Sequence, residues 1–128
     1  FDRIDLHIRV PAVKYKELSQ ENESEESAAV RERVLLARAI QQKRLESYGI
    51  YCNAQMTRQT LRRFCTLDPE SEKKMEHVIT RLGLSARAYT RILRVSRTIA
   101  DLENIGRILP RHVAEAIQYR TLDYACWQ

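Results

Sequence analysis

The sequence contains little glycine and proline, with only three of each among its 128 residues. Sheet proteins with many turns use both residues often, so their scarcity argues against a turn-rich β architecture and favours long helices. The chain also lacks the roughly 20 consecutive apolar residues of a membrane-spanning helix and the charged, then apolar, start of a signal peptide. We therefore expect a cytoplasmic protein with no membrane partner.

The cysteines and histidines are too scattered to predict a metal site. They are Cys52, Cys65, Cys126, His7, His77 and His112. No two cysteines are spaced as Cys-x-x-Cys, and no histidine lies near a cysteine at a metal-ligand spacing. We predict no metal site, small buried thiols at Cys52 and Cys65, and surface or hydrogen-bonded core histidines at His77 and His112.

The sequence also lacks the parts that phosphoryl transfer requires. It has no Gly-x-x-x-x-Gly-Lys-[Ser/Thr] loop to surround phosphates, and no apolar run ends in paired acidic residues that could hold Mg²⁺. We therefore expect the chain alone neither to bind ATP tightly nor to hydrolyse it. Its arginines could still assist such a reaction, because a guanidinium stays protonated and makes two parallel bonds to a phosphate.

Charge is distributed unevenly along the chain. The formal net charge is +5, yet residues 17–26 carry five glutamates and no basic residue. Residues 27–128 carry 18 Lys and Arg against 10 Asp and Glu, a net charge of +8. A glutamate-rich polar stretch is typical of a flexible linker, whereas a basic helical region raises the chance of a polyanionic partner.

The chain divides near residue 26. Apolar and polar side chains alternate over residues 4–10, which predicts one short strand ending at Pro11. No other segment alternates in this way, so we interpret this as a core strand separated from its sheet, and we expect an excised piece of a larger protein. In this chain we expect the segment to be frayed or paired with something foreign. Residues 1–26 would then be this strand and an acidic linker, and residues 27–128 a helical domain.

Capping residues predict five helices after the linker. The first is capped by Ser24 or Ser27 and ends before Gly49, the second is capped by Thr57, the third runs from Asp68-Pro69 to Gly83, the fourth is capped by Ser85, and the fifth opens at Leu109-Pro110. Amphipathic helices with short connections predict an all-α helical bundle over residues 27–123.

The helix after Ser85 has two distinct faces. At about 100° per residue, one stripe holds Ala88, Ile92, Val95, Ile99 and Leu102, and the opposite side holds Arg87, Arg91, Arg94 and Arg97. The apolar stripe requires a core. The arginines have no carboxylate at helix spacing before Asp101, so we expect them to be solvated or directed at phosphate.

Residues 84–102 resemble a known family. The run Leu84-Ser85-Ala86-Arg87-Ala88-Tyr89, with its continuation to Leu102, is similar to the C-terminal signature of the magnesium-chelatase-like AAA+ ATPases, in the YifB/ComM competence-protein branch. Residues 1–11 resemble the segment that closes the family's ATPase core. The resemblance extends to Arg38, Gln41-Gln42, Arg44, Asn53-Ala54 and residues 119–123, and so covers essentially the whole chain.

The resemblance implies that the chain is the helical lid of a ring-forming AAA+ ATPase. Arg87 would be its sensor-2 arginine, Arg91 would assist at the γ-phosphate of ATP, and Arg3 would be the arginine finger that acts across a subunit boundary. The full-length protein would bind ATP and Mg²⁺. Its implied partners are the AAA+ core of the same protein, further copies in a hexameric ring, and DNA, on which the motor would perform branch migration during recombination.

Two other functions stay open. A free-standing basic helical module would bind DNA through its own arginine face, where each arginine contributes by charge rather than by position. A chelatase-type subunit is the other, although chelatase relatives differ from this chain at Ala88-Tyr89-Thr90.

Overall fold

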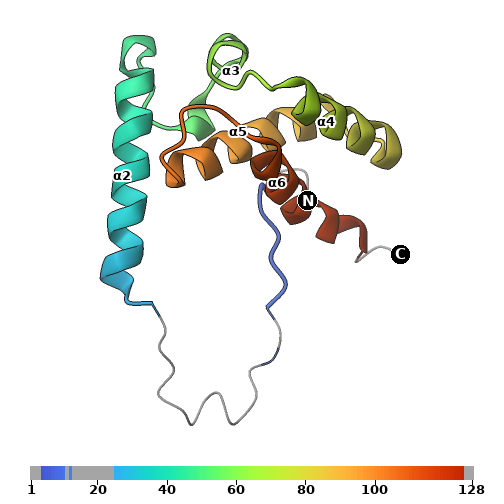
Figure 1. Ribbon diagram of the computed structural model, residues 1–128, viewed down its shortest axis with the longest axis horizontal. Helices are drawn as coiled ribbons and strands as arrows, with labels where there is room; N and C mark the ends of the chain where they lie inside the picture. Colours follow the sequence, from blue (N-terminus) through green and yellow to red (C-terminus); the bar gives the residue numbers. More distant parts are fainter. Residues whose placement is uncertain (1–3, 11, 13–24, 126–128) are drawn as a thin grey trace.

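The computed structural model describes residues 4–10, 12 and 25–125, with side chains as far as Arg120 (Figure 1). In chain order the elements are α2 (Ser27–Leu45), η1 (Glu46–Tyr48), η2 (Asn53–Gln55), α3 (Arg58–Phe64), α4 (Pro69–Leu82), α5 (Ala86–Leu102) and α6 (Pro110–Ala125), where η marks a 3₁₀ helix. These described ranges contain no strand. The predicted all-α fold with five α-helices is therefore confirmed.

The strand predicted over residues 4–10 does not form. This segment lies instead against the C-terminal half of α6. The backbone N–H of His7 donates to the carbonyl of Tyr119 at 3.0 Å, and Arg120 donates from Nη1 to the carbonyl of Ile4 at 2.9 Å. The missing ladder agrees with the absence of a second strand in the described part of the chain, because a strand requires a neighbour for its hydrogen bonds. The segment nevertheless docks on a helix end, where we expected it to be frayed or paired with something foreign. The predicted linker over residues 13–24 lies outside the described residues.

Helix α5 occupies the centre of the bundle. It packs most extensively against α6 and also contacts α2, α3 and η2. The core is a single cluster of apolar side chains around it: Leu45, Met56, Leu61, Cys65, Met75, Leu84, Ala88, Ile92, Leu93, Ile108, Val113 and Ala116. Because every α-helix contributes to this cluster, the five helices are stabilised together by the burial of apolar surface.

Helix α2 begins without the predicted serine cap. Ser27 is its first helical residue, and Glu26 occupies the N-cap position without a side-chain hydrogen bond. Ser24 lies outside the described residues. An ion pair between Arg33 and Glu25 at 2.8 Å instead spans the first turns of the helix.

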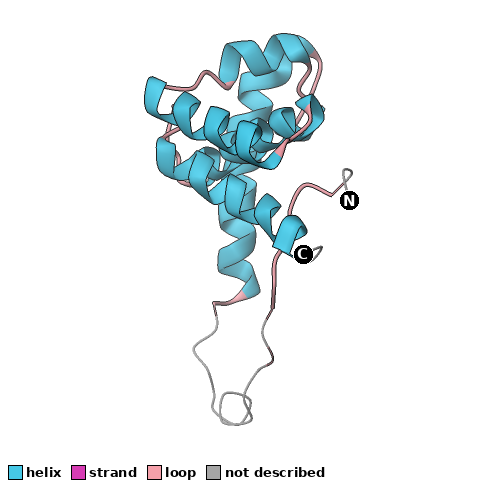
Figure 2. Cartoon of the chain, turned by 90° about the vertical axis from the view of Figure 1, so that its right-hand side faces the viewer, coloured by secondary structure: helices cyan, strands magenta, loops and turns pink. Residues whose placement is uncertain are grey.

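The N-terminal half of α2 extends beyond the packed helices, as the two perpendicular views show (Figures 1 and 2). Val30 and Val34 on this half are 40% and 45% exposed, whereas Ala37 and Leu45 further along are buried. The apolar side chains of α2 are therefore buried only in its C-terminal half.

Local signals predict the next helix boundaries correctly. Gly49 follows η1 with φ = 72°, a left-handed conformation that favours glycine. The N-cap residue of α3 is Thr57, whose backbone N–H donates to Oγ1 of Thr60 at 2.8 Å. The carboxylate of Asp68 accepts a bond from the Ser71 N–H at 2.7 Å at the start of α4. These contacts are made within one turn of chain, which is why the sequence reveals them.

The buried face of α5 is rotated from the predicted stripe. Ala88 and Ile92 are buried as expected, but Leu102 is 47% exposed. Leu93, Ser96 and Ala100, on the neighbouring side of the helix, are buried in their place. Arg97, from the predicted arginine face, is buried along with them.

Candidate functional site

A short, well-capped connection fixes the start of α5. Three residues, 83–85, separate α4 from α5, and the first of them, Gly83, caps α4 in the left-handed conformation with φ = 62°. Leu84 is buried, and the side-chain oxygen of Ser85 accepts a hydrogen bond from the Ala88 N–H at 3.2 Å. Arg87 is thereby held in the first turn of α5, at the helix end whose dipole favours an anion.

The side chain of Arg87 is exposed and unengaged. Its guanidinium makes no hydrogen bond or ion pair with any residue that the structure describes. Its backbone is well fixed, because the Arg87 carbonyl accepts a bond from Oγ1 of Thr90 at 3.0 Å in addition to its place in the helix. A rigid backbone and five unused donors suit this residue to an anionic ligand.

Arg91 lies one turn further along and already has a partner. Its Nη1 lies 3.1 Å from Oδ1 of Asp5, and only 13% of its side chain is exposed. Arg91 therefore links α5 to the segment 4–10. The hydrogen bonds of Tyr119 and Arg120 link α6 to the same segment. A contact between Arg91 and a γ-phosphate, its predicted role, would require the ion pair with Asp5 to open.

A groove of about 780 Å³ runs beside this ion pair. Its walls come from the segment 4–10, α2, α5 and α6, and Arg91 and Arg94 lie along it. Its apolar lining includes Leu6, Val30, Val34, Val95, Ile99 and Leu102. Three apolar residues of the predicted α5 stripe, Val95, Ile99 and Leu102, thus line this groove, whereas Ala88 and Ile92 lie in the core.

Arg94 and Arg97 contradict the prediction that the arginines of α5 are solvated or directed at phosphate. Arg94 donates from Nη2 to the backbone carbonyl of Met56 at 3.0 Å. Arg97 is only 2% exposed and donates to the carbonyls of Ile105 at 2.7 Å and Gly106 at 3.0 Å. Burial lowers the pKa of Arg97, and the Asp101 carboxylate opposes that shift. Both guanidiniums act as internal supports of the fold.

The turn after α5 explains the burial of Arg97. Asn104 adopts the left-handed conformation with φ = 57°, and the Ile105 N–H then bonds back to the Ala100 carbonyl at 2.9 Å. The reversed chain brings the carbonyls of Ile105 and Gly106 over α5, where they require donors. Arg97 supplies those donors.

A buried carboxylate, Asp101, organises the polar interior. Arg44 of α2 donates to its two oxygens at 3.0 Å and 2.5 Å, and Nε of Arg97 lies 3.3 Å from Oδ1. The side-chain amide of Asn53 donates to Oδ2 at 2.9 Å. The Asp101 side chain has no exposed surface, so its charge requires these partners.

Asn53 extends this network to α2. Its backbone N–H donates to Oε1 of Gln41 at 3.0 Å, and its side-chain amide also donates to Oγ1 of Thr98 at 2.9 Å. Gln41, Arg44 and Asn53 are residues on which the family resemblance rests. The structure gives them a structural role that sequence reasoning missed, although the spacing of Arg97 and Asp101, four residues apart, was a signal for part of it.

Glu103 links the C-terminal end of α5 to the N-terminal end of α6. Its Oε2 accepts a bond from Arg111 Nη2 at 2.6 Å and lies 3.0 Å from Nε2 of His112. The hydrogen bond from Arg111, then that from His112, lowers the pKa of Glu103. Nδ1 of the buried His112 accepts the Leu109 N–H at 2.9 Å. His112 is therefore a hydrogen-bonded core histidine, as predicted, and His77 lies exposed on α4.

Other kinds of site find little support in the described ranges. Within them no cluster of His, Cys, Asp and Glu side chains could hold a metal ion. Burial raises the pKa of the Cys65 thiol to about 11, which keeps it protonated and unreactive at neutral pH. None of the described helices is both long enough and apolar enough to cross a membrane. Arg3 and Cys126 lie outside the described residues, so the arginine finger stays a prediction.

Comparison with known proteins places these residues in a family. Residues 24–120 match the family described as "Magnesium chelatase, subunit ChlI C-terminal". The chain is 42% identical to the competence protein ComM of Haemophilus influenzae over 122 residues, which are 94% of this chain and 23% of that protein. It is 38% identical to the protein YifB of Escherichia coli and 36% identical to YifB of Salmonella typhimurium, each over 95% of this chain and 24% of the relative. The chain thus spans about a quarter of the length of these relatives, and it belongs to the magnesium-chelatase C-terminal family, in the branch that contains ComM and YifB.

Proposed function

We propose that this domain is the lid of a ring-forming AAA+ ATPase and that Arg87 is its sensor-2 arginine. One observation carries the proposal: of the four arginines on the predicted basic face of α5, Arg87 alone has no partner among the described residues. Arg91, Arg94 and Arg97 bind Asp5, Met56 and the turn after α5. A rigid helix start that presents one unpaired guanidinium suits the γ-phosphate of a nucleotide held by an adjoining core.

The other parts of the ATPase would come from the remainder of the protein. In this proposal the AAA+ core binds ATP and Mg²⁺, and copies assemble into a hexameric ring in which Arg3 reaches the nucleotide of the neighbouring subunit. The docking of residues 4–7 on α5 and α6 supports a close connection between core and lid. Similarity to a competence protein supports DNA as the material on which the motor works, with branch migration as the reaction.

The alternative, a free-standing module that binds DNA through the arginine face of α5, finds less support. Such a DNA-binding module requires several interchangeable arginines on one open surface. Arg97 is buried, Arg94 donates to the backbone and Arg91 has an ion pair with the N-terminal segment, so this face offers a single guanidinium without a partner among the described residues.

Steady-state ATP hydrolysis by the full-length protein that contains this domain tests the proposal. Arg87→Ala should lower turnover by on the order of 10²–10³-fold, by analogy with other arginines that contact a γ-phosphate. Arg87→Lys should restore only part of it, because an ammonium cannot reproduce two parallel hydrogen bonds. Arg81→Ala, which removes an exposed arginine from α4, is the matched control. Near-normal turnover for Arg87→Ala in an intact ring would overturn the sensor assignment.

A further inference from the structure

The region around α3 is basic and contains no acid. Residues 47–67 include no Asp or Glu and three arginines, Arg58, Arg62 and Arg63. All three are exposed, and no carboxylate of the described residues pairs with them. This is the opposite of α5, where three of the four arginines have internal partners.

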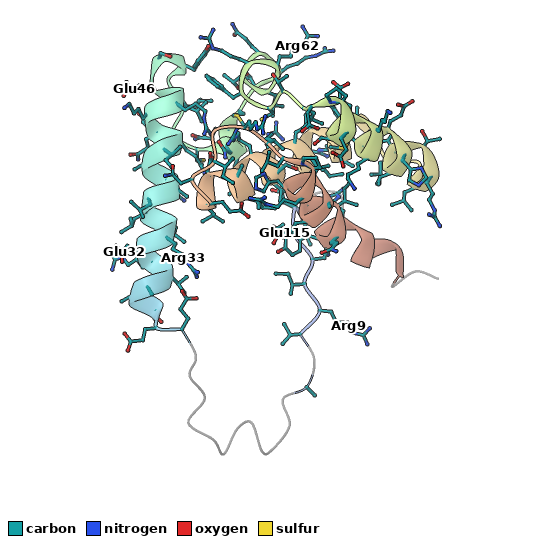
Figure 3. The ribbon with its side chains drawn as sticks, viewed as in Figure 1. Arg9, Glu32, Arg33, Glu46, Arg62 and Glu115 are labelled. Atoms are coloured by element: carbon teal, nitrogen blue, oxygen red, sulfur yellow. The ribbon has the colours of Figure 1, made fainter. Side chains whose placement is uncertain are left out.

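The three arginines share one surface of α3. Arg58 and Arg62 are four residues apart and so lie one above the other, while Gln59 and Arg63 form the adjacent row. Together with Tyr48 of η1 these side chains line a hollow of about 570 Å³. Figure 3 shows Arg62 projecting outward from α3, at the end of the molecule away from Arg9 in the N-terminal segment. We call this set of five residues the α3 arginine surface.

The stability of α3 itself does not fully explain why three arginines lie at these positions. Arg62 and Arg63 lie in the last turn, where a positive charge is favourable, and Arg63 also lies 5.7 Å from the centre of the Phe64 ring. Arg58 lies in the first turn, which contains no acidic residue and whose dipole disfavours a cation. Like charges one turn apart, as at Arg58 and Arg62, also repel each other. An anionic partner would relieve both effects.

We infer that the α3 arginine surface binds the phosphate backbone of a nucleic-acid strand. Guanidiniums one turn apart can contact neighbouring phosphates of a single strand, with Gln59 as an additional donor between them. Tyr48, half-buried against Phe64 with the ring centres 5.8 Å apart, adds an aromatic edge to the hollow. The surface carries no feature that would read bases, so binding should depend on salt and little on sequence.

This inference rests on the proposed function only in the choice of DNA as the strand. It uses none of the residues assigned to ATP hydrolysis. The two proposals can therefore fail separately: loss of turnover on changing Arg87 tests the first, and DNA affinity on changing α3 tests the second.

Fluorescence anisotropy of the chain with labelled DNA tests the α3 arginine surface. The probes are oligo(dT) of about 20 nucleotides and a duplex of the same length, titrated at several salt concentrations between about 50 and 200 mM. Arg58→Gln and Arg62→Gln, singly and together, remove charge from exposed positions and keep polar side chains. Lys73→Gln and Lys74→Gln on α4 remove the same charge from another exposed face and serve as controls.

Each arginine that contacts a phosphate should reduce the magnitude of the logarithmic salt slope by about 0.7 for the single strand or about 0.9 for the duplex. The lysine controls should leave both the slope and the affinity almost unchanged. Equal losses for the lysine and arginine variants would overturn the inference, as would an absence of binding by the unaltered chain at about 50 mM salt. A polyglutamate peptide that displaces the DNA at equal charge concentration would assign the surface to an acidic protein segment instead.

Discussion

Arg44 and Asp101 form a two-point ion pair between α2 and α5, although 57 positions separate them in the sequence. Their contact lies in the interior, where 14% of the Arg44 side chain and none of the Asp101 side chain is exposed. Among the described residues, α2 has few other polar contacts with the bundle, because its N-terminal half projects beyond the bundle. This ion pair is therefore the main polar connection between α2 and the rest of the domain.

Removing the carboxylate should destabilise the domain strongly. Asp101→Ala would leave two guanidiniums, those of Arg44 and Arg97, without their shared partner in the interior. Breaking a buried pair in this way costs about 3–5 kcal/mol of unfolding free energy. Urea unfolding followed by circular dichroism measures the loss.

The exposed ion pair on α2 provides the control for Asp101. Arg33 and Glu25 retain 57% and 49% side-chain exposure, so Arg33→Ala should cost no more than about 1 kcal/mol. Similar losses for Asp101→Ala and Arg33→Ala would contradict the organising role of Asp101.

Cys65 should make stability decrease in alkaline solution. Burial raises the pKa of its thiol from 9.0 to about 11, so the folded chain keeps a proton that the unfolded chain releases. The contribution to stability is complete below pH 9 and is lost as the pH rises from 9 to 11, by up to about 3 kcal/mol. Cys65→Ala should lack this loss, so the unfolding free energies of parent and variant should converge over that range. Parallel curves would show that the thiol does not titrate differently in the two states.

Ser85 should stabilise the start of α5 as a cap. Ser85→Ala removes the acceptor of the Ala88 N–H and should lower the unfolding free energy by about 1 kcal/mol, whereas Ser85→Asp should be nearly neutral. Thermal unfolding of the two variants measures this difference. An equal loss for alanine and aspartate would mean that packing at this position, and not capping, is the source of the stability.

Asp5 should hold the N-terminal segment on the bundle. Asp5→Ala removes the partner of Arg91, so the backbone bond from His7 to Tyr119 should open more often. Amide hydrogen exchange at His7 should then accelerate, while amides in the middle of α5 keep their protection. Leu6→Ser is a useful companion, because it changes an exposed neighbour without removing a charge. Unchanged exchange at His7 in Asp5→Ala would show that the ion pair contributes little.

Helix boundaries could be predicted from the sequence because their chemistry is local. Asp68-Pro69, Gly83 and Ser85 each act within one turn of chain, and the structure places helix ends at all three. The docking of residues 4–10 on α6 could not be predicted in this way, because its partners, Tyr119 and Arg120, are distant in sequence.

The roles of the α5 arginines could not be predicted for the same physical reason. Periodicity places Arg94 and Arg97 on a polar face, but burial depends on which acceptors the rest of the chain brings to them. The carbonyls that engage Arg97 come from a turn that is set by the left-handed Asn104, and nothing in the spacing of α5 indicates it. The unengaged state of Arg87 is equally a property of its surroundings.

The hydrogen bond from Arg120 to the carbonyl of Ile4 joins residues that are 116 positions apart. It holds the N-terminal segment directly on the last helix of the domain. A pull or twist applied at residue 4 therefore reaches α5 and α6 in one step, without passing through α2, α3 and α4. Movement at residue 4 thus has two routes to α6, this hydrogen bond and the chain itself through the intervening helices. A displacement of the N-terminal segment would therefore act directly on α5 through Asp5 and on α6 through Ile4.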